Sequence, residues 1–271
     1  MRAEATTVLS ERIARRGVRL ISAVVLGFLI APMLIVIPLS FNASTYFSYP
    51  MTGFSLEWYR TILSSPDWRH AILNSFIIGA GATAIATALG TLAAIGISRP
   101  AFPFRSLIVP LLISPMIIPI VIVAVSLYLV FAPLGLINTH LGVILAHAAL
   151  GAPFVVITVA AKLMAFDRNL SRAAAGLGAS PWTSFRRVML PRILPAVVTG
   201  SVFAFATSFD EVVVILFIGG TEQRTIPRQM WAGIRDQINP TILAMAGLLT
   251  VFAIILFLFM DVLRRRNSAD A

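Results

Sequence analysis

The sequence contains no cysteine, and only 12% of its 271 residues are charged. Without cysteine the chain can form no disulfide, carry out no thiol catalysis and hold no metal through sulfur. A soluble domain of this length needs roughly twice that share of charged residues to cover its surface. Because 58% of the residues are hydrophobic and the mean hydropathy is +0.92, the composition predicts a protein embedded in lipid.

Motifs that would indicate an enzyme are also missing. There is no Gly-x-x-x-x-Gly-Lys-Ser/Thr loop, and Lys162 is the only lysine, so the chain does not hold ATP in the P-loop manner. Neither a His-Glu-x-x-His pair nor a Gly-x-Ser-x-Gly elbow occurs. The histidines His70, His140 and His147 are too scattered to predict a metal site. We therefore expect no active site, no metal and no cofactor in this chain itself.

Six long apolar stretches can be read along the sequence. A hydrocarbon core about 30 Å thick requires about 20 apolar residues of helix. We accordingly expect an all-α membrane protein with six transmembrane helices, at residues 20–41, 71–97, 106–131, 141–161, 193–218 and 240–262. The first stretch is longer than a signal-peptide core and lacks a small-residue cleavage site, so we expect it to be retained as an anchor.

Basic residues set the expected orientation. Sixteen of the 21 lysines and arginines fall on the side that holds both termini, which is typical of the cytoplasmic side. The net charge of +10 is then a topology signal with an attraction to anionic lipid, and it does not favour nucleic-acid binding. This predicts a cytoplasmic tail at 1–19, a transmembrane domain at 20–263 that includes a cytoplasmic loop at 162–192, and a cytoplasmic tail at 264–271.

Two of the predicted spans have distinctive compositions. The span at 71–97 is rich in glycine and alanine, which permit close approach of helix backbones, so we expect it at the centre of the bundle. The span at 106–131 carries Pro110, Pro115 and Pro119, and proline bends a helix and leaves carbonyls unpaired. The bend could line a water-filled path or be a static kink, and the sequence favours neither.

Other residues in and near the spans have two interpretations each. His147 in the fourth span is expected to bond to a neighbouring helix, with a ligand or proton-relay role as the alternative. The external segment holds Trp58, Tyr59 and Trp68, which suit either anchoring at the membrane interface or contact with a partner protein.

The cytoplasmic loop has the pattern of two short helices joined by a turn. Ser171 is a plausible N-cap of the first helix, and Gly176 and Gly178 allow the turn. Ser180-Pro181 suits the start of the second helix, on which Trp182 and Phe185 share one face. An apolar face outside the membrane must be covered, either by the protein's own bundle and lipid headgroups or by a partner protein.

This loop resembles the EAA loop of permease subunits in bacterial ATP-binding-cassette importers. It reads Arg172-Ala173-Ala174-Ala175-Gly176-Leu177-Gly178, then nine residues, then Val188-Met189-Leu190-Pro191. One departure is plain, because the family usually has glutamate where this chain has Arg172. The resemblance implies that the loop is a coupling loop that docks on an ATPase. The implied docking residues are Arg172, Ala173, Ala174, Gly178, Trp182, Phe185, Leu190 and Pro191.

The resemblance extends over roughly residues 70 to 262. Asn74-Ser75 at the start of the second span, and His147 with Pro153 in the fourth, are similar to this permease family. The stretch from Ser208 to Val214, which reads Ser-Phe-Asp-Glu-Val-Val-Val, is similar to the acidic stretch of permeases of the spermidine/putrescine class. The resemblance thus implies a type I importer permease fold with both termini in the cytoplasm.

The family also implies an assembly in the bacterial inner membrane. Its expected members are a second permease that forms a heterodimer with this chain, two ATPases that bind ATP and magnesium, and a periplasmic solute-binding protein. The leading substrate is a polyamine, putrescine or spermidine. Another nitrogenous solute, such as an opine or aminobutyrate, and iron are the alternatives within the same architecture. An ion-driven secondary transporter would be expected to show repeat symmetry, which the sequence lacks, and a structural assembly factor would show no substrate-dependent ATP hydrolysis.

Asp210 and Glu211 lie about seventeen residues into the fifth predicted span. At 1.5 Å per residue they are about 25 Å from its cytoplasmic end, in the outer half of the membrane. Carboxylates at that depth are costly and face a cavity or a partner. They predict an anionic site on the path of a cationic solute. The alternative is a structural ion pair with a companion subunit, since the spans offer no obvious basic partner.

Overall fold

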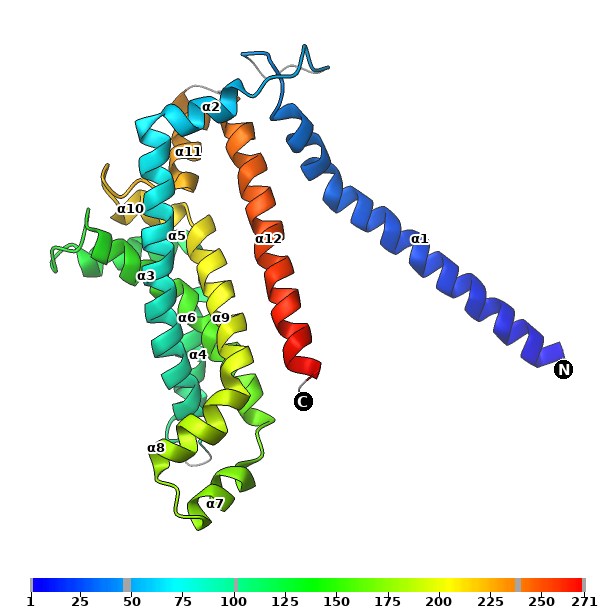
Figure 1. Cartoon of the computed structure of the whole chain (residues 1–271), viewed down its shortest axis with the longest axis vertical. Coiled ribbons are helices and arrows are strands. Elements are labelled where there is room, and N and C mark those ends of the chain that lie inside the picture. Colours follow the sequence, from blue (N-terminus) through cyan, green and yellow to red (C-terminus); the bar gives the residue numbers. More distant parts are fainter. Residues whose placement is uncertain (1, 46–49, 100–101, 237–239, 270–271) are drawn as a thin grey trace. The chain divides into compact units, whose positions relative to one another are not determined.

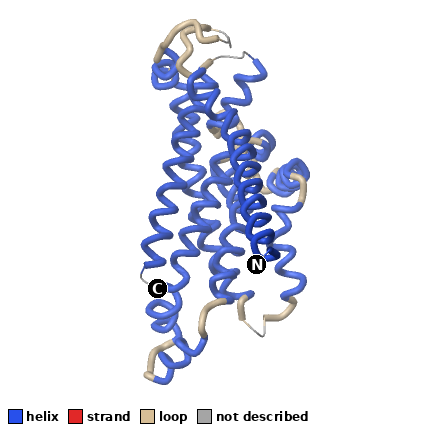
Figure 2. Tube along the Cα trace, turned by 90° about the vertical axis from the view of Figure 1, so that its right-hand side faces the viewer, coloured by secondary structure: helices blue, strands red, loops and turns tan. Residues whose placement is uncertain are grey.

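The computed structural model describes residues 2–45, 50–99, 102–236 and 240–269, and almost all of them are helical (Figure 1). Figure 2 shows helices and loops and no strand in this part of the chain, which has one isolated bridge between Asn42 and Phe54. Two compact units are present. One comprises Met1–Ile62 with Gln237–Phe252, and the other comprises Leu63–Asp236 with Ala253–Ala271.

The helices follow the apolar stretches of the sequence. They are α1 (Arg2–Leu39), α2 (Glu57–Ser64), α3 (Pro66–Ile97), α4 (Arg105–Ile117), α5 (Ile120–Phe131), α6 (His140–Met164), α7 (Arg168–Gly176), α8 (Pro181–Ser184), α9 (Leu190–Asp210), α10 (Val213–Ile218), α11 (Ile226–Asp236) and α12 (Thr241–Ala269). Five helical segments in the described residues are long and apolar enough to cross a membrane, and the bent pair α4–α5 makes six if it is one span. The all-α membrane fold is thereby confirmed, with five or six candidate spans in the described residues.

The two predicted tails are largely helical. The first helix begins at Arg2, within the expected tail at 1–19, and its membrane-spanning part is Arg15–Leu39. At the other end α12 continues to Ala269, into the expected tail at 264–271, whose last two residues lie outside the described part. The ends of α1 and α12 therefore extend beyond the predicted spans into the two predicted tails.

The first unit holds a compact segment that follows α1. Phe41 stacks on Phe54 and Tyr59 with ring centroids 5.1 Å apart in both pairs. The indole of Trp58 is buried and donates a 2.9 Å hydrogen bond from Nε1 to the Asn42 carbonyl. In the second unit Trp68 is buried as well. Both tryptophans are buried, so neither indole is free to face lipid headgroups or a partner protein, and for the half-buried Tyr59 the two interpretations stay predictions.

The core of the second unit is formed by α3, α6 and α9, which lie side by side (Figure 1). A Cβ added at Gly90 of α3 would lie 2.7 Å from Val155 Cβ of α6, and one added at Gly200 of α9 would lie 2.8 Å from Val155 Cα. Only glycine permits helix backbones to approach this closely. The prediction of close packing by the small-residue span is confirmed, but the more central helix is α6, which contacts α3, α4, α9 and α10.

The span at 106–131 is broken rather than bent. Its two halves, α4 and α5, meet at an angle of 109°. Pro119 cannot donate a backbone hydrogen bond, and it holds Ile118 in an extended conformation at φ −71°, ψ 136°. Pro110 and Pro115 lie inside α4 without ending it. The bend was predicted, but the complete break at Ile118–Pro119 was not.

The prediction of one helix over residues 193–218 is wrong. The helix α9 ends at Asp210, Glu211 is extended at φ −75°, ψ 122°, and the short helix α10 follows. The run Val212–Val214 is β-branched and lowers helix propensity, and the Glu211 carboxylate accepts the Val214 N–H at 2.9 Å. This carboxylate competes with the helix for that donor. We had expected the two acidic residues at consecutive helical positions. Instead, Asp210 is the last residue of α9 and Glu211 is extended.

The short helix α10 packs against α5 and α6. Its side chains Val214, Ile215 and Ile218 form a buried cluster with Ala124 of α5 and with α6 residues that include Val143. The two interrupted segments, α4–α5 and α9–α10, are thus in contact with each other. In membrane proteins, non-helical backbone at depth is tolerated where it is buried in protein or lines a water-filled cavity.

Candidate docking surface and translocation site

The predicted docking surface is built from α7, α8 and the turn between them, which we call the foot (Figure 1). The first foot helix is capped by Asp167, whose carboxylate accepts the Asn169 N–H at 2.9 Å. The expectation that Ser171 caps this helix is wrong, because the helix already begins at Arg168. An aspartate N-cap three residues before Leu170 was a signal that the sequence did contain.

The turn of the foot depends on Gly178. This residue has φ +84°, in the left-handed region that glycine adopts without steric cost. The Gly178 N–H bonds to the Ala175 carbonyl at 2.9 Å, and the Ala179 N–H bonds to the Ala174 carbonyl at 3.0 Å. This pair of bonds is a Schellman motif, which satisfies the last carbonyls of a helix. The glycine turn that the sequence predicted is present.

The second foot helix continues into the bundle without a loop. Ser180 is its N-cap and accepts the Thr183 N–H at 3.2 Å, as predicted. A π-helical turn, Phe185–Met189, joins α8 to α9. The ring of Pro191 would clash with the carbonyl four residues earlier in a regular α-helix, and the wider turn gives it room. Residues Pro181–Asp210 therefore form one segment of 30 residues.

The foot exposes large apolar side chains. Leu177 is 90% exposed and Trp182 is 67% exposed. Phe185 is half-buried with its ring centroid 5.5 Å from that of Trp182. Of the other predicted docking residues, Arg172, Ala173, Gly178 and Pro191 are exposed, Ala174 is half-buried, and Leu190 packs against the core of α3, α6 and α9. The structure thus presents most of the predicted residues on an open surface and turns Leu190 toward the bundle.

The two predicted pathway residues have different environments. Asp210 is exposed at the end of α9, where no hydrogen bond holds its carboxylate within the described residues. Glu211 is half-buried and caps the first turn of α10 through Val214. The carbonyl end of a helix carries partial negative charge. The end of α9 and the Asp210 carboxylate together therefore create a negative site at the end of α9 that lies away from the foot.

His147 joins α6 to α9. It is fully buried, and its Nδ1 lies 2.9 Å from the Ser208 hydroxyl. The expected bond to a neighbouring helix is confirmed. Its Nε2 has no partner among the described residues. Ser208 lies two residues before Asp210, so this bond fixes the last turn of α9 next to the negative site.

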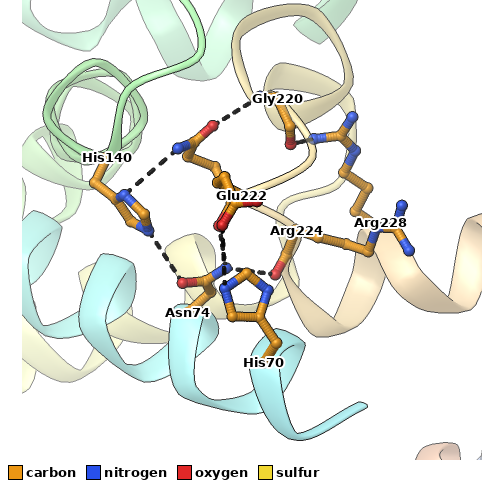
Figure 3. Close-up of polar contacts among 8 residues, drawn as sticks. His70, Asn74, His140, Gly220, Glu222, Arg224 and Arg228 are labelled. Atoms are coloured by element: carbon orange, nitrogen blue, oxygen red, sulfur yellow. Dashed lines mark hydrogen bonds and ion pairs between the residues drawn. The ribbon is translucent and has the colours of Figure 1, made fainter. Parts of the chain in front are cut away.

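A polar network joins α3 and α6 to the loop between α10 and α11 (Figure 3). The Asn74 amide of α3 donates to the carbonyls of Glu222 at 2.7 Å and Arg224 at 3.0 Å. Its oxygen lies 3.1 Å from His140 Nε2 on α6, and the Ser75 hydroxyl accepts the Ile226 N–H at 2.8 Å. The network fastens the loop between α10 and α11 to two helices of the bundle.

An open hollow of about 520 Å³ lies beside this network, lined by Pro66, Asp67, Arg69, His70, Leu73 and Glu222. The His70 ring is 3.9 Å from the Glu222 carboxylate (Figure 3). Sequence reasoning noticed Asn74 and Ser75 only through their resemblance to a family. The signal it missed was physical, because two polar residues at the start of an apolar span need partners at that level.

Helices that span a membrane, a broken helix ending in carboxylates and a projecting foot define a helical membrane component of a transport system. Residues 86–269 match the family of binding-protein-dependent transport system inner membrane components. The chain therefore belongs to this family. It is an inner-membrane, multi-pass, non-catalytic subunit of an importer whose ATPase partner binds the nucleotide and whose solute arrives on a binding protein.

Named relatives agree with this assignment. The chain is 31% identical over 245 residues to the spermidine/putrescine transport system permease protein PotC of Haemophilus influenzae, covering 90% of this chain and 95% of the relative. It is 32% identical over 229 residues to the putrescine transport system permease protein PotI of Escherichia coli K12, covering 82% and 81%. In fold it is similar to a bacterial ABC transporter that imports the polysaccharide alginate, with a TM-score of 0.72, 16% identity and coverage of 91% and 96%.

Proposed function

We propose that this chain forms, together with a second and different permease, the transmembrane path for a small cationic solute, with a polyamine such as putrescine or spermidine as the leading candidate. Two ATPases dock below, one on the foot of each permease, and a periplasmic binding protein delivers the solute from above. In this arrangement both termini and the coupling loop at 162–192 lie in the cytoplasm.

The observation that carries this proposal is the interruption between α9 and α10 at Glu211. The Asp210 carboxylate, exposed and without a partner in the described residues, adds to the negative end of α9. Interrupted helices whose carbonyl ends face a cavity are a recurrent way in which transporters hold cations. Relatives named for spermidine and putrescine transport supply the choice of cation.

Asp210→Asn tests the path. The carboxylate charge is removed while the size is kept, so we expect uptake of labelled putrescine in cells to fall at least tenfold with the ATPase still copurifying. Glu211→Gln is the matched control, because its amide oxygen can still accept the Val214 N–H. We expect this second change to have the smaller effect.

The outcomes separate the two interpretations of the acidic pair. If Asp210→Asn instead releases the second permease from the complex, the carboxylate is part of an ion pair between subunits. Unchanged uptake in both variants would remove the pair from the solute path.

Competition distinguishes the candidate solutes. Excess spermidine should suppress uptake of labelled putrescine, whereas aminobutyrate, an opine or ferric iron should not. Suppression by one of those solutes alone would keep the importer architecture and replace the substrate. Uptake that persists after ATP depletion and follows an ion gradient would instead favour a secondary transporter.

A further inference from the structure

The foot and its flanks carry an excess of positive charge. Residues 162–192 contain six basic residues and a single acidic one, Asp167. The Asp167 carboxylate caps α7 through the Asn169 N–H at 2.9 Å, so it is already engaged inside the foot. The cations of this surface must therefore find their counter-charges outside the segment.

The arginines of α7 differ in how they are held. Arg168 donates to the Ser98 carbonyl at the end of α3 and thereby fastens the foot to the bundle. Arg172 is exposed, and its guanidinium makes one long bond of 3.3 Å, to the Asn169 side chain. Residues four apart on a helix lie on one face. Arg168 and Arg172 therefore share one face of α7. Of these two cations, Arg172 is the one that does not fasten the foot to the bundle.

Apolar side chains stand beside this cation. Leu177 and Trp182 are 90% and 67% exposed, which is a large apolar surface to leave in water. A surface that combines exposed apolar anchors with an unneutralised arginine fits a groove with an apolar floor and an acidic rim.

Length favours a protein groove over lipid headgroups as the cover of the foot. The continuous segment Pro181–Asp210 has 30 residues, which is about 45 Å at 1.5 Å per residue. A hydrocarbon core of about 30 Å and a headgroup layer of about 6 Å on each side leave the start of α8 beyond the headgroups. α7 and the turn lie at that end of the segment (Figure 1).

We infer that the ATPase groove which receives the foot bears a carboxylate that pairs with Arg172, and that this pair selects the ATPase that this permease accepts. The inference rests on the proposed docking function. A permease of opposite charge at this position would be rejected by the same ATPase, because like charges face each other across the contact.

Charge reversal tests the pair. The assay titrates the purified ATPase that copurifies with the wild-type complex onto the full-length permease complex in nanodiscs of phosphatidylcholine. Arg172→Glu should weaken binding at least tenfold, and Arg172→Lys should stay within about threefold of the wild type. Arg192→Glu is the matched control, since Arg192 is an exposed arginine on the stem of the same segment. It should have little effect.

Compensation identifies the partner residue. Acidic residues of the ATPase groove are changed to lysine one at a time, and one of them should restore binding of the Arg172→Glu permease while weakening binding of the wild type. If no such change restores binding, or if Arg192→Glu acts as strongly as Arg172→Glu, the specific pair is overturned. Binding that requires phosphatidylglycerol in the nanodisc would assign the charge to lipid instead.

A further pair of variants keeps the two proposals apart. Leu177→Asp and Trp182→Asp change exposed anchors of the foot. If these abolish ATPase binding and Arg172→Glu does not, the foot docks but the ion pair is wrong. If none of the three changes affects binding, docking through the foot is itself wrong.

Discussion

Asn74 shows how one side chain can organise the end of the bundle where α3 begins. Its amide satisfies two carbonyls of the loop between α10 and α11, while its oxygen meets His140 on α6. A carbonyl left unpaired in a half-buried position costs free energy comparable to a lost hydrogen bond. The same side chain therefore sets both the position of the loop and the spacing of two helices.

Replacing Asn74 with leucine should destabilise the protein. The change keeps the volume but leaves the Glu222 and Arg224 carbonyls without their donor, which we expect to cost about 1–3 kcal/mol. Thermal unfolding in detergent, followed by size-exclusion chromatography, should register a lower midpoint. Ser201→Ala is the control, because that hydroxyl bonds only within its own helix, to the Val198 carbonyl at 2.8 Å. Equal midpoints for the two variants would contradict this account of Asn74.

At the scale of elements, the contact of α3, α6 and α9 depends on glycine. A Cβ at Gly200 would lie 2.5 Å from the Thr158 hydroxyl oxygen and 2.8 Å from Val155 Cα. Side chains can be displaced at small cost, but a backbone atom can move only with its helix. The close spacing of α9 and α6 consequently depends on both helix surfaces, with Gly200 on one and Val155 and Thr158 on the other.

Gly200→Ala should therefore separate α9 from α6. We expect a loss of about 1–3 kcal/mol from overpacking, measured as a lower unfolding midpoint in detergent. Gly96→Ala on α3 is the matched control, since its nearest neighbour would be Phe102 at 3.8 Å. That change should be neutral or slightly stabilising because alanine favours helix. A Gly200→Ala protein as stable as the control would show that the interface has room.

At the scale of the whole molecule, the foot and the proposed solute site at Asp210 lie on one helical segment. Docking residues at its start and Asp210 at its end are joined by α8, the π-helical turn and α9, without an intervening loop. Motion of an ATPase against the foot can thus reach the carboxylate as a movement of a packed helix. Coupling between two sites requires such an element, whose position both sites can bias.

Val188→Pro should uncouple the two sites. Proline in the π-helical turn removes a donor and weakens the connection between α8 and α9 without changing the exposed surface of the foot. We expect the ATPase to copurify while solute uptake per ATP hydrolysed falls at least tenfold in proteoliposomes. Val188→Ala keeps the helix and should transport normally. If solute uptake per ATP hydrolysed is unchanged in the proline variant, movement of the foot is not transmitted to α9 through this turn.

Sequence alone determined the membrane character, the positions of most spans and the foot, because these depend on local composition. Apolar length gives the helices, glycine at position 178 gives the turn, and Ser180-Pro181 gives a helix start. The predicted docking residues were named from the resemblance to the EAA loop, a motif that lies within about 20 residues of sequence. Family membership likewise followed from the spacing of a short motif and was then shown over residues 86–269.

Only the tertiary structure decided what depends on distant partners. The contact between α5 and α10 and the network around Asn74 join segments far apart in the chain, whereas α9 ends beside the local bond between Glu211 and Val214. The burial of Trp58 and Trp68 belongs here too, because an aromatic residue near a span suits the interface and the interior equally well until its neighbours are known. Local pattern specifies which helix can form, whereas the free energy of packing and of satisfying polar groups determines where it ends and what it meets.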